Sequence, residues 1–211
     1  MSLTEQLKAY ADQSAQKIPA EAQVLMKKAI DDLSDSDILN NAYKTGDQLP
    51  DISLPNAKGD TIHLKEELKK GTLVIAFYRG GWCPYCNIEL KALQNALPEI
   101  QTKGAQLIAI TPETPDNSLS TQEKNELTFE VLTDRNNEVA RSLGLVYQLP
   151  DELNELYLNF GINLDKSQGN DKQELPIAAT YVVNQNGEIT YHFLQEDYKL
   201  RADPKNIIAA L

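Results

Sequence analysis

The sequence of this 211-residue chain predicts an α/β fold, in which helices join the strands of a central sheet. Three observations support this prediction. Two apolar runs, Thr72–Tyr78 and Gln106–Thr111, have the composition of strands that are buried on both faces. The stretch after the first run carries apolar residues at helical spacing, namely Cys86, Leu90, Leu93, Leu97 and Ile100. The only two cysteines, Cys83 and Cys86, stand where that strand ends and the helix begins.

Composition and charge narrow the function classes. Hydrophobic residues make up 41% of the chain, and its formal net charge is −11. Nucleic acids and anionic membranes attract clustered Lys and Arg, so we expect neither as a partner. The first residues, MSLTEQLKAYADQ, lack the basic and apolar regions of a secretory signal, and no apolar run suits a transmembrane helix. We therefore expect a cytoplasmic protein, in which a cysteine pair is more often catalytic than structural.

The N-terminal part predicts helices that precede the main domain. Residues 3–40 have helical apolar spacing with a break at Pro19, and their apolar faces must be buried somewhere. We expect them to cover the main domain or to pack in a homodimer. The turn-rich segment 44–50 marks a boundary, so we divide the chain into a helical extension, 1–43, and a redox domain, 44–211.

Further elements follow from turn signals and periodicity. They are a hairpin of Ile52–Leu54 and Thr61–Leu64, a short helix from Ser118 or Ser120, a strand Phe129–Leu132, helices Asn136–Leu143 and Asp151–Phe160, a surface loop 161–174, a second hairpin of Thr180–Asn184 and Glu188–Leu194, and a last helix after Asp203. Carboxyl ends of parallel strands gather at one sheet edge, so Glu113 and Asp116 are expected near Cys83. Proton transfer and turn formation are both open roles for these two carboxylates.

The sequence Trp82-Cys83-Pro84-Tyr85-Cys86 predicts thiol redox chemistry. Pro84 fits the first helical position, which makes Cys83 the N-cap and Cys86 the third helical residue. Free backbone N–H groups and the helix dipole favour a thiolate at Cys83, and in such motifs the pKa falls from about 8.5 to roughly 3.5–7.5. Cys86 lies on the apolar stripe and is expected to be less exposed. We therefore predict that Cys83 attacks and Cys86 resolves.

Three other roles for the cysteine pair have less support. A zinc site needs four ligands, whereas His63 and His192 are single and far apart, so we expect no metal and no other cofactor. An inert disulfide is uncommon in a reducing compartment. The glycines before Cys83 and its N-cap position argue against a purely structural core residue. A strand, Cys-X-X-Cys and a helix in this order favour redox chemistry.

With these residues the chain resembles the AhpC/TSA (peroxiredoxin-like) family of the thioredoxin-fold superfamily, over roughly residues 44–211. The resemblance is best at Phe77–Cys86, and the segments 111–118, 175–181 and 197–204 add to it. It implies a thioredoxin-like fold, with a mixed central sheet flanked by helices. It also implies reduction of hydroperoxides or disulfides at the expense of a cellular thiol, such as a thioredoxin or glutathione.

The chain departs from both parent patterns. In register, the peroxidatic cysteine of typical peroxiredoxins falls on Cys86, their threonine on Cys83, and their activating arginine near Ala178. The buried aspartate of thioredoxins corresponds to Phe77, and their cis-proline to Ala178. Arg79, close in sequence to Cys83, is the residue expected to replace the missing positive charge. Its alternative role is that of a surface cation at a strand end.

These observations give one main hypothesis and two alternatives. Cys83, Cys86 and Arg79 are expected to be catalytic in a thiol-dependent peroxidase. The residues expected to contact the substrate are their neighbours Trp82, Pro84 and Tyr85. The first alternative is a thioredoxin-like thiol–disulfide oxidoreductase, and the second is a non-catalytic binding module on the same fold. The physiological substrate, the reductant and the oligomeric state stay open.

Overall fold

The computed structural model describes residues 1–211 and has a mixed five-stranded sheet at its centre. The strand order is β5-β4-β3-β8-β9. The parallel strands are β3 (Thr72–Phe77), β4 (Ala105–Thr111) and β5 (Glu130–Thr133). The antiparallel strands are β8 (Ala179–Val183) and β9 (Ile189–Leu194). The predicted α/β class with a mixed central sheet is therefore confirmed.

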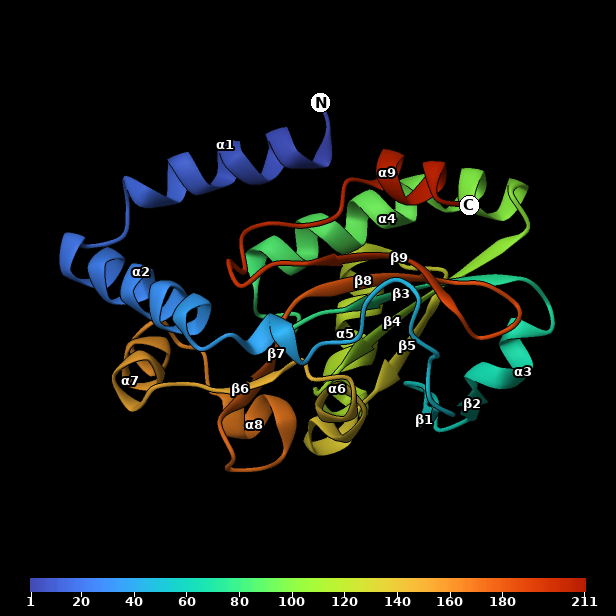
Figure 1. Ribbon diagram of the computed structural model, residues 1–211. Coiled ribbons are helices and arrows are strands. Elements are labelled where there is room, and N and C mark those ends of the chain that lie inside the picture. The colour runs from blue at the N-terminus through green and yellow to red at the C-terminus, as the bar shows by residue number, and fades with distance from the viewer.

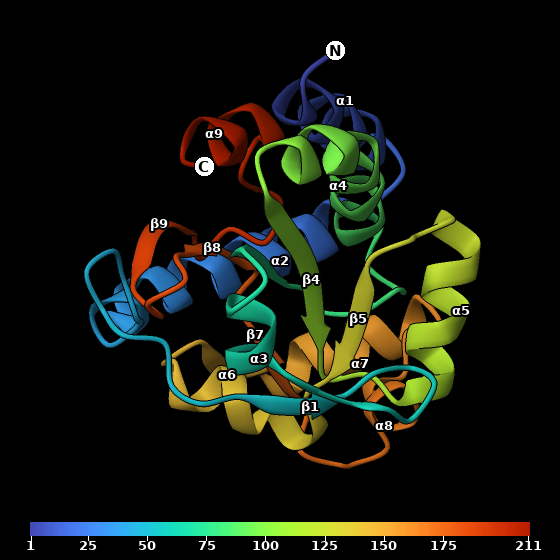
Figure 2. The ribbon, with the colours of Figure 1, turned by 90° about the vertical axis from the view of Figure 1, so that its right-hand side faces the viewer.

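Helices cover both faces of the sheet (Figure 1). One face carries α4 (Pro84–Thr102), α9 (Pro204–Ala209) and α1 (Leu3–Ala15). The other face carries α3 (Leu64–Leu68), α6 (Glu138–Ser142), and the hairpin of β1 (Ser53–Pro55) and β2 (Thr61–His63). Figure 2 shows α5 (Pro115–Asn125) beside β5, on the side away from β9.

Alternation along β3 explains why it lies at the centre. Val74, Ala76 and Tyr78 pack with α4, whereas Leu73, Ile75 and Phe77 pack with α3 and α6. Successive side chains in a strand point to opposite faces, so an uninterrupted apolar run buries both. The five residues of the predicted helical stripe, Cys86 to Ile100, are all buried on α4. The motif between β3 and α4 is thus held by two well-packed elements.

The segment between α6 and β8 corrects one sequence prediction. It contains β6 (Val146–Gln148), α7 (Asp151–Asn159), α8 (Leu164–Gln168) and β7 (Glu174–Pro176), and β6 pairs with β7. The prediction that residues 161–174 form a surface loop is wrong, because α8 buries Leu164 and Ser167. The helix is one turn long and mostly polar, so its sequence carries little periodicity.

The start of α5 also differs from the prediction. The helix begins at Pro115, with Thr114 as N-cap, rather than at Ser118 or Ser120. Proline has the helical φ preset and lacks an N–H, so it is suited to this first position. The short 3₁₀ helix η2 (Arg135–Asn137) precedes α6 within the predicted helical segment Asn136–Leu143. The other predicted elements have counterparts within a few residues of their expected bounds.

The N-terminal helices lie over one end of the molecule. α1 packs on α4, and α2 (Ala20–Asp35) packs on α7 before the short 3₁₀ helix η1 (Ile38–Asn40). Leu3 and Leu7 of α1 belong to the main core, so α1 is docked rather than free. We call α1 and α2 together the hood. None of the helices combines the length and the apolar character needed to cross a bilayer.

Candidate active site

The cysteine motif adopts the predicted helix start. Cys83 is the N-cap of α4 and Pro84 follows at its first position. The Cys83 side chain makes no regular capping hydrogen bond, which differs from the expectation. Both cysteines are free thiols, with exposed fractions of 2% for Cys83 and 0% for Cys86. Cys83 is thus more deeply buried than its N-cap position suggested, but it lines a cavity and Cys86 does not.

The surroundings of the two thiols push their pKa values apart. Burial alone would raise the pKa of Cys83, but a hydrogen bond with Cys86 and the charges of Arg79 and Arg201 outweigh it and lower that pKa to about 6. Burial, followed by the neighbouring Cys83 sulfur, raises the pKa of Cys86 well above its ordinary value. These surroundings favour the thiolate at Cys83, which is the sulfur expected from the sequence to attack.

Arg79 is a buried cation held among aromatic rings. Its exposed fraction is 1%, which excludes the alternative of a surface cation. The guanidinium carbon lies 5.0 Å from the ring centroid of Trp82, 5.7 Å from that of Tyr157 and 4.5 Å from that of Tyr198. Its Nη2 donates to the Tyr157 hydroxyl, and its Nε–H has no partner. Arg79 thus keeps its charge, and one free donor, beside the cavity that Cys83 lines.

A second arginine, Arg201, lies beneath the motif. Its Nη2 is 3.3 Å from the Cys86 sulfur, and its Nε donates to Glu89 Oε2 over 2.5 Å. Nη1 donates to the backbone oxygens of Tyr198 and Leu200. Burial raises the pKa of Glu89 to about 7 despite this ion pair. No arginine stands near Ala178, where the resemblance placed the activating arginine of typical peroxiredoxins. In this chain the segment between β9 and α9 brings an arginine, Arg201, to the Cys86 sulfur.

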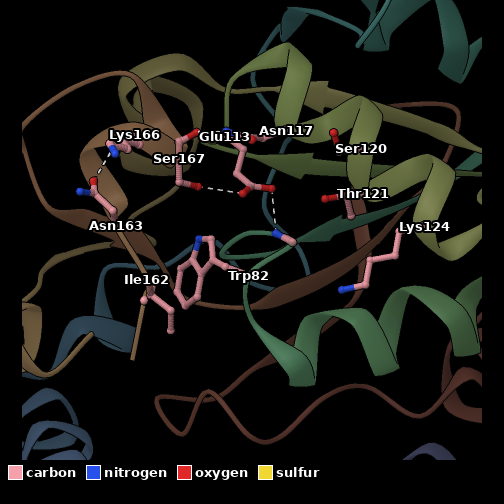
Figure 3. A pocket seen from close by; sticks show the side chains of 12 residues that line it. Trp82, Glu113, Asn117, Ser120, Thr121, Lys124, Ile162, Asn163, Lys166 and Ser167 are labelled. Carbon is pink, nitrogen blue, oxygen red and sulfur yellow. Dashed lines mark hydrogen bonds between the residues drawn. The ribbon is translucent and has the colours of Figure 1, made fainter. Parts of the chain in front are cut away.

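Glu113 holds the loop that precedes Cys83. Its carboxylate accepts a hydrogen bond from the Gly81 N–H over 2.7 Å and one from the Ser167 hydroxyl over 2.8 Å (Figure 3). A Cβ at Gly81 would lie 2.0 Å from Thr121 Oγ1, so a larger residue here would require the Thr121 side chain to move. Burial raises the pKa of Glu113. Glu113 lies near the motif as predicted, whereas Asp116 is exposed in the first turn of α5.

A polar pocket of about 380 Å³ lies on the α5 and α8 side of Trp82. Trp82, Glu113, Lys124 and Lys166 are among the residues that line it (Figure 3). Neither cysteine lines this pocket. It therefore borders the backbone of the motif without reaching the reactive sulfur.

Asn87 fixes the start of α4. Its Nδ2 donates to the Gly81 oxygen over 2.7 Å and to the Cys83 oxygen over 2.9 Å. Its Oδ1 accepts a hydrogen bond from Asn125 of α5 over 2.8 Å. One side chain thus ties the loop, the N-cap residue and a neighbouring helix together, which limits the positions open to the Cys83 sulfur.

The largest cavity near the motif lies between the hood and the cysteine loop. Its volume is about 1030 Å³, and 14 of its 24 lining residues are hydrophobic. We call it the hood cavity. Its floor carries Cys83, with the predicted site residues around it, namely Arg79, Trp82, Pro84 and Tyr85. The structure thus brings all the predicted site residues except Cys86 together on the floor of this cavity. Cys86 is buried behind them. The roles of these residues stay predictions.

Several residues of this site escape sequence reasoning. Arg201 lies 115 positions from Cys86 and Tyr157 lies 78 positions from Arg79, so no local spacing connects them. The nearest signal was the segment 197–204, which added to the family resemblance without giving Arg201 a role. No group of three or more His, Cys, Asp and Glu side chains gathers in an arrangement that would hold a metal ion.

Comparison with known proteins adds independent findings. The model of the AhpC/TSA family matches residues 45–192. Over 127 residues the chain is 27% identical to peroxiredoxin bcp1 of Schizosaccharomyces pombe, an alignment that covers 60% of this chain and 63% of that protein. Over 105 residues it is 28% identical to peroxiredoxin Bcp of Escherichia coli, which covers 50% of this chain and 67% of that one. The chain thus spans less than two thirds of the length of the yeast relative.

Solved structures show the same architecture. Peroxidoxin BcpB from Mycobacterium tuberculosis superposes with a TM-score of 0.62 at 19% identity, covering 79% of this chain and 95% of that one. The bacterioferritin comigratory protein of Xanthomonas campestris superposes with a TM-score of 0.59 at 15% identity, covering 75% and 88%. Likeness at this level of identity concerns the fold. The thioredoxin-like fold expected from the resemblance is thereby confirmed.

Proposed function

The chain belongs to the AhpC/TSA family, and from this membership and the geometry of its two cysteines we propose that it is a thiol-dependent peroxidase. One observation carries the proposal. Cys83, whose pKa is lowered to about 6, lines a large cavity, while Cys86 stands one helical turn further on, buried and with a raised pKa. The printed names of the relatives, which are peroxiredoxins, support the same activity.

In the first step the Cys83 thiolate attacks the terminal oxygen of the hydroperoxide. An S–O bond forms, the O–O bond breaks, and the leaving oxygen takes up a proton to give an alcohol or water. Negative charge moves from sulfur to the leaving oxygen, so donors near that oxygen stabilise the transition state. Arg79, which lines the hood cavity with Cys83 and has an unpartnered Nε–H, is the donor that we propose for this oxygen.

In the second step the Cys86 thiol attacks the Cys83 sulfenic acid. A disulfide between the two cysteines forms and water leaves, with the Cys86 proton going to the departing hydroxide. The raised pKa of Cys86 keeps its thiol from competing for peroxide in the first step. The Arg201 guanidinium, 3.3 Å from the Cys86 sulfur, stabilises the thiolate that develops during resolution.

An external thiol restores the enzyme by exchange with the disulfide. Thioredoxin and glutathione are the reductants that we propose, and the cycle is suited to the reducing cytoplasm expected from the sequence. Each turnover oxidises two thiols of the reductant and reduces one hydroperoxide. The chain itself contributes no other redox group to this cycle.

Cysteine variants test the proposal. Cys83→Ser should lose peroxide consumption altogether. Cys86→Ser should consume one equivalent of peroxide and stop as a sulfenic acid, which a dimedone-type reagent traps. Trapping at Cys86 in a Cys83→Ser protein that still consumes peroxide would reverse the two roles and favour the register of typical peroxiredoxins.

A second candidate function is thiol–disulfide exchange, and the Cys-Pro-Tyr-Cys motif itself favours it. An N-cap thiolate followed by a buried thiol is also suited to attack on a disulfide. In that case Cys86→Ser should accumulate mixed disulfides with other proteins. A wild-type protein that reduces disulfides readily but leaves hydrogen peroxide and organic hydroperoxides untouched would refute the peroxidase proposal.

A further inference from the structure

The hood is a part of the chain that the family model does not match. That model begins at residue 45, whereas α1 and α2 end at Asp35. The hood nevertheless contacts the family domain, with α1 on α4 and α2 on α7 (Figure 1). The Tyr10 ring of α1 lies edge-on to Tyr85, with a centroid distance of 5.1 Å. At the turn between the two helices, Gln23 donates to the backbone oxygens of Ala15 and Ile18, each over 2.8 Å.

The hood forms one wall of the hood cavity, and the loop that carries Cys83 forms another. The hood's contribution mixes polar and charged side chains with an apolar set, namely Ala11, Ala15, Ile18, Val24, Met26 and Ile30. Val24 is 68% exposed, so this wall presents apolar surface to the open space instead of burying it. Exposed apolar surface that lines a cavity beside a reactive group is typical of a binding site.

The size of the cavity exceeds what hydrogen peroxide needs. A water molecule takes up about 30 Å³, and hydrogen peroxide is only slightly larger. The hood cavity measures about 1030 Å³, a volume in the range of sites for organic ligands. The reactive end is narrow: Cys83 and Arg79 line the cavity, and both are almost completely buried.

Charged side chains of both signs line the cavity, namely Asp12, Asp31, Asp197, Lys17, Lys27, Lys199 and Arg79. Of the three lysines that line it, Lys27 pairs with Asp31 over 2.5 Å and Lys199 with Asp197 over 3.3 Å. Lys17 remains, on the exposed turn after α1. Because neither sign of charge dominates this lining, an uncharged molecule gains from the cavity chiefly by apolar contact.

Given the peroxidase function proposed above, on which this inference rests, we propose that the hood determines substrate specificity. The hydroperoxide that this protein reduces carries an alkyl or aromatic body. That body lies against Ala15, Ile18 and Val24, and the peroxide group reaches Cys83. Hydrogen peroxide, which has no such body, gains nothing from the hood and is the poorer substrate.

The test compares two peroxides on full-length variants. The probes are cumene hydroperoxide, with an aromatic body, and hydrogen peroxide, and the quantity measured is the ratio of their kcat/KM values. Ala15→Trp fills the cavity from the end of α1, and Val24→Asp places a charge on its wall. Ala15 and Val24 are both exposed, so neither change removes a buried contact. The matched controls are Ala9→Trp on α1 and Leu158→Asp on α7, whose parent residues are exposed and do not line the cavity.

We expect wild type to prefer cumene hydroperoxide. In Ala15→Trp and Val24→Asp the ratio should fall by about tenfold, which corresponds to about 1.4 kcal/mol of lost binding. The controls should keep the wild-type ratio. A ratio that is the same in all five proteins, with both peroxides consumed, would overturn the role of the hood and leave the peroxidase function standing. A wild type that consumes neither peroxide would instead overturn the peroxidase function, and this inference with it.

Discussion

Arg79 is a buried cation that packs among aromatic rings and also lowers the pKa of Cys83. Its guanidinium is sandwiched between aromatic rings from three parts of the chain, Trp82, Tyr157 and Tyr198. Stacking on ring faces lets a cation stay charged in a place that excludes water. The charge therefore acts on Cys83 through a medium that screens it little.

Replacing Arg79 with methionine should raise the pKa of Cys83. Methionine keeps an unbranched apolar stem of similar length but removes the positive charge, and loss of a nearby opposite charge shifts a pKa by about 1–3 units. The thiolate absorbance of wild type should have its midpoint near pH 6. The midpoint of Arg79→Met should lie higher, and Arg79→Lys should stay between the two. If Arg79→Met has the same midpoint as wild type, the low pKa of Cys83 is due to Arg201 and to the hydrogen bond with Cys86 instead.

Glu89 is a buried carboxyl whose effect on stability depends on pH. Its pKa is raised to about 7 in the folded protein, whereas an exposed glutamate has a pKa of about 4.3. A folded state that holds a proton more tightly than the unfolded state is most stable at low pH. The free energy of unfolding should therefore fall as pH rises from about 4.5 to about 7, by about 3 kcal/mol from this group alone.

Denaturant titrations between pH 4.5 and 7.5 measure this slope. Glu113 and Asp134, whose pKa values burial also raises, add slopes of the same sign. The difference between wild type and Glu89→Gln isolates the contribution of Glu89, because glutamine does not titrate. We expect the slope of Glu89→Gln to be shallower. Parallel curves for the two proteins would mean that Arg201 keeps Glu89 ionised throughout this pH range.

The placement of the two cysteines could be inferred from local sequence, whereas the position of Arg201 beside them could not. Pro84 after Cys83 marks the helix start, and the apolar stripe from Cys86 to Ile100 marks Cys86 as the inner residue; both signals are local in the sequence. Arg201 reaches Cys86 only because α9 folds back over α4. A contact of that kind depends on tertiary packing, for which propensity and periodicity carry no signal.

At the scale of elements, the junction between β3 and α4 depends on Asn87. Removing this amide leaves the backbone oxygens of Gly81 and Cys83 without its hydrogen bonds. Asn87→Ala should lower the free energy of unfolding by about 1–3 kcal/mol, because partly buried polar groups lose their partners. It should also slow alkylation of Cys83 at neutral pH, since the N-cap sulfur is no longer held beside Arg79.

Chemical denaturation and a timed reaction with a small alkylating reagent check this prediction. Asn206→Ala, an exposed position on α9, is the control and should match wild type in both measurements. A variant that is destabilised but alkylated at the wild-type rate would show that Asn87 supports the fold without placing the sulfur.

Elements with a strong apolar period were predicted well, and short polar ones were not. β3 and α4 carry their pattern over many residues; β3 ends one residue before its expected bound, and α4 begins at the expected Pro84. α8 has five residues, and its buried members include Ser167 and Gln168, which composition assigns to the surface. In their buried positions Ser167 donates to Glu113 and Gln168 donates to the backbone oxygen of Glu174. Such tertiary hydrogen bonds cannot be read from the sequence.

At the scale of the whole molecule, the position of the hood governs access to Cys83. The helical extension was predicted from its apolar spacing, and two ways of burying its faces were left open. Within this chain, α1 covers α4 and α2 covers α7. The hood is attached through few buried residues, chiefly Leu3 and Leu7. Regions with few buried contacts open locally more often than the core.

Weakening the attachment of the hood should therefore make Cys83 accessible by local opening of α1, without unfolding of the central sheet. Leu7→Ala removes a buried side chain of α1, which costs about 2–5 kcal/mol in well-packed cores. If α1 opens as a local unit, alkylation of Cys83 by a bulky maleimide should speed up by about tenfold or more, because the open population rises by a similar factor. Leu68→Ala, a buried leucine of α3 in the opposite core cluster, is the matched control. It should lower the melting temperature comparably without changing the alkylation rate at 25 °C, well below melting. Equal acceleration in both variants would mean that Cys83 becomes accessible only when the whole protein unfolds.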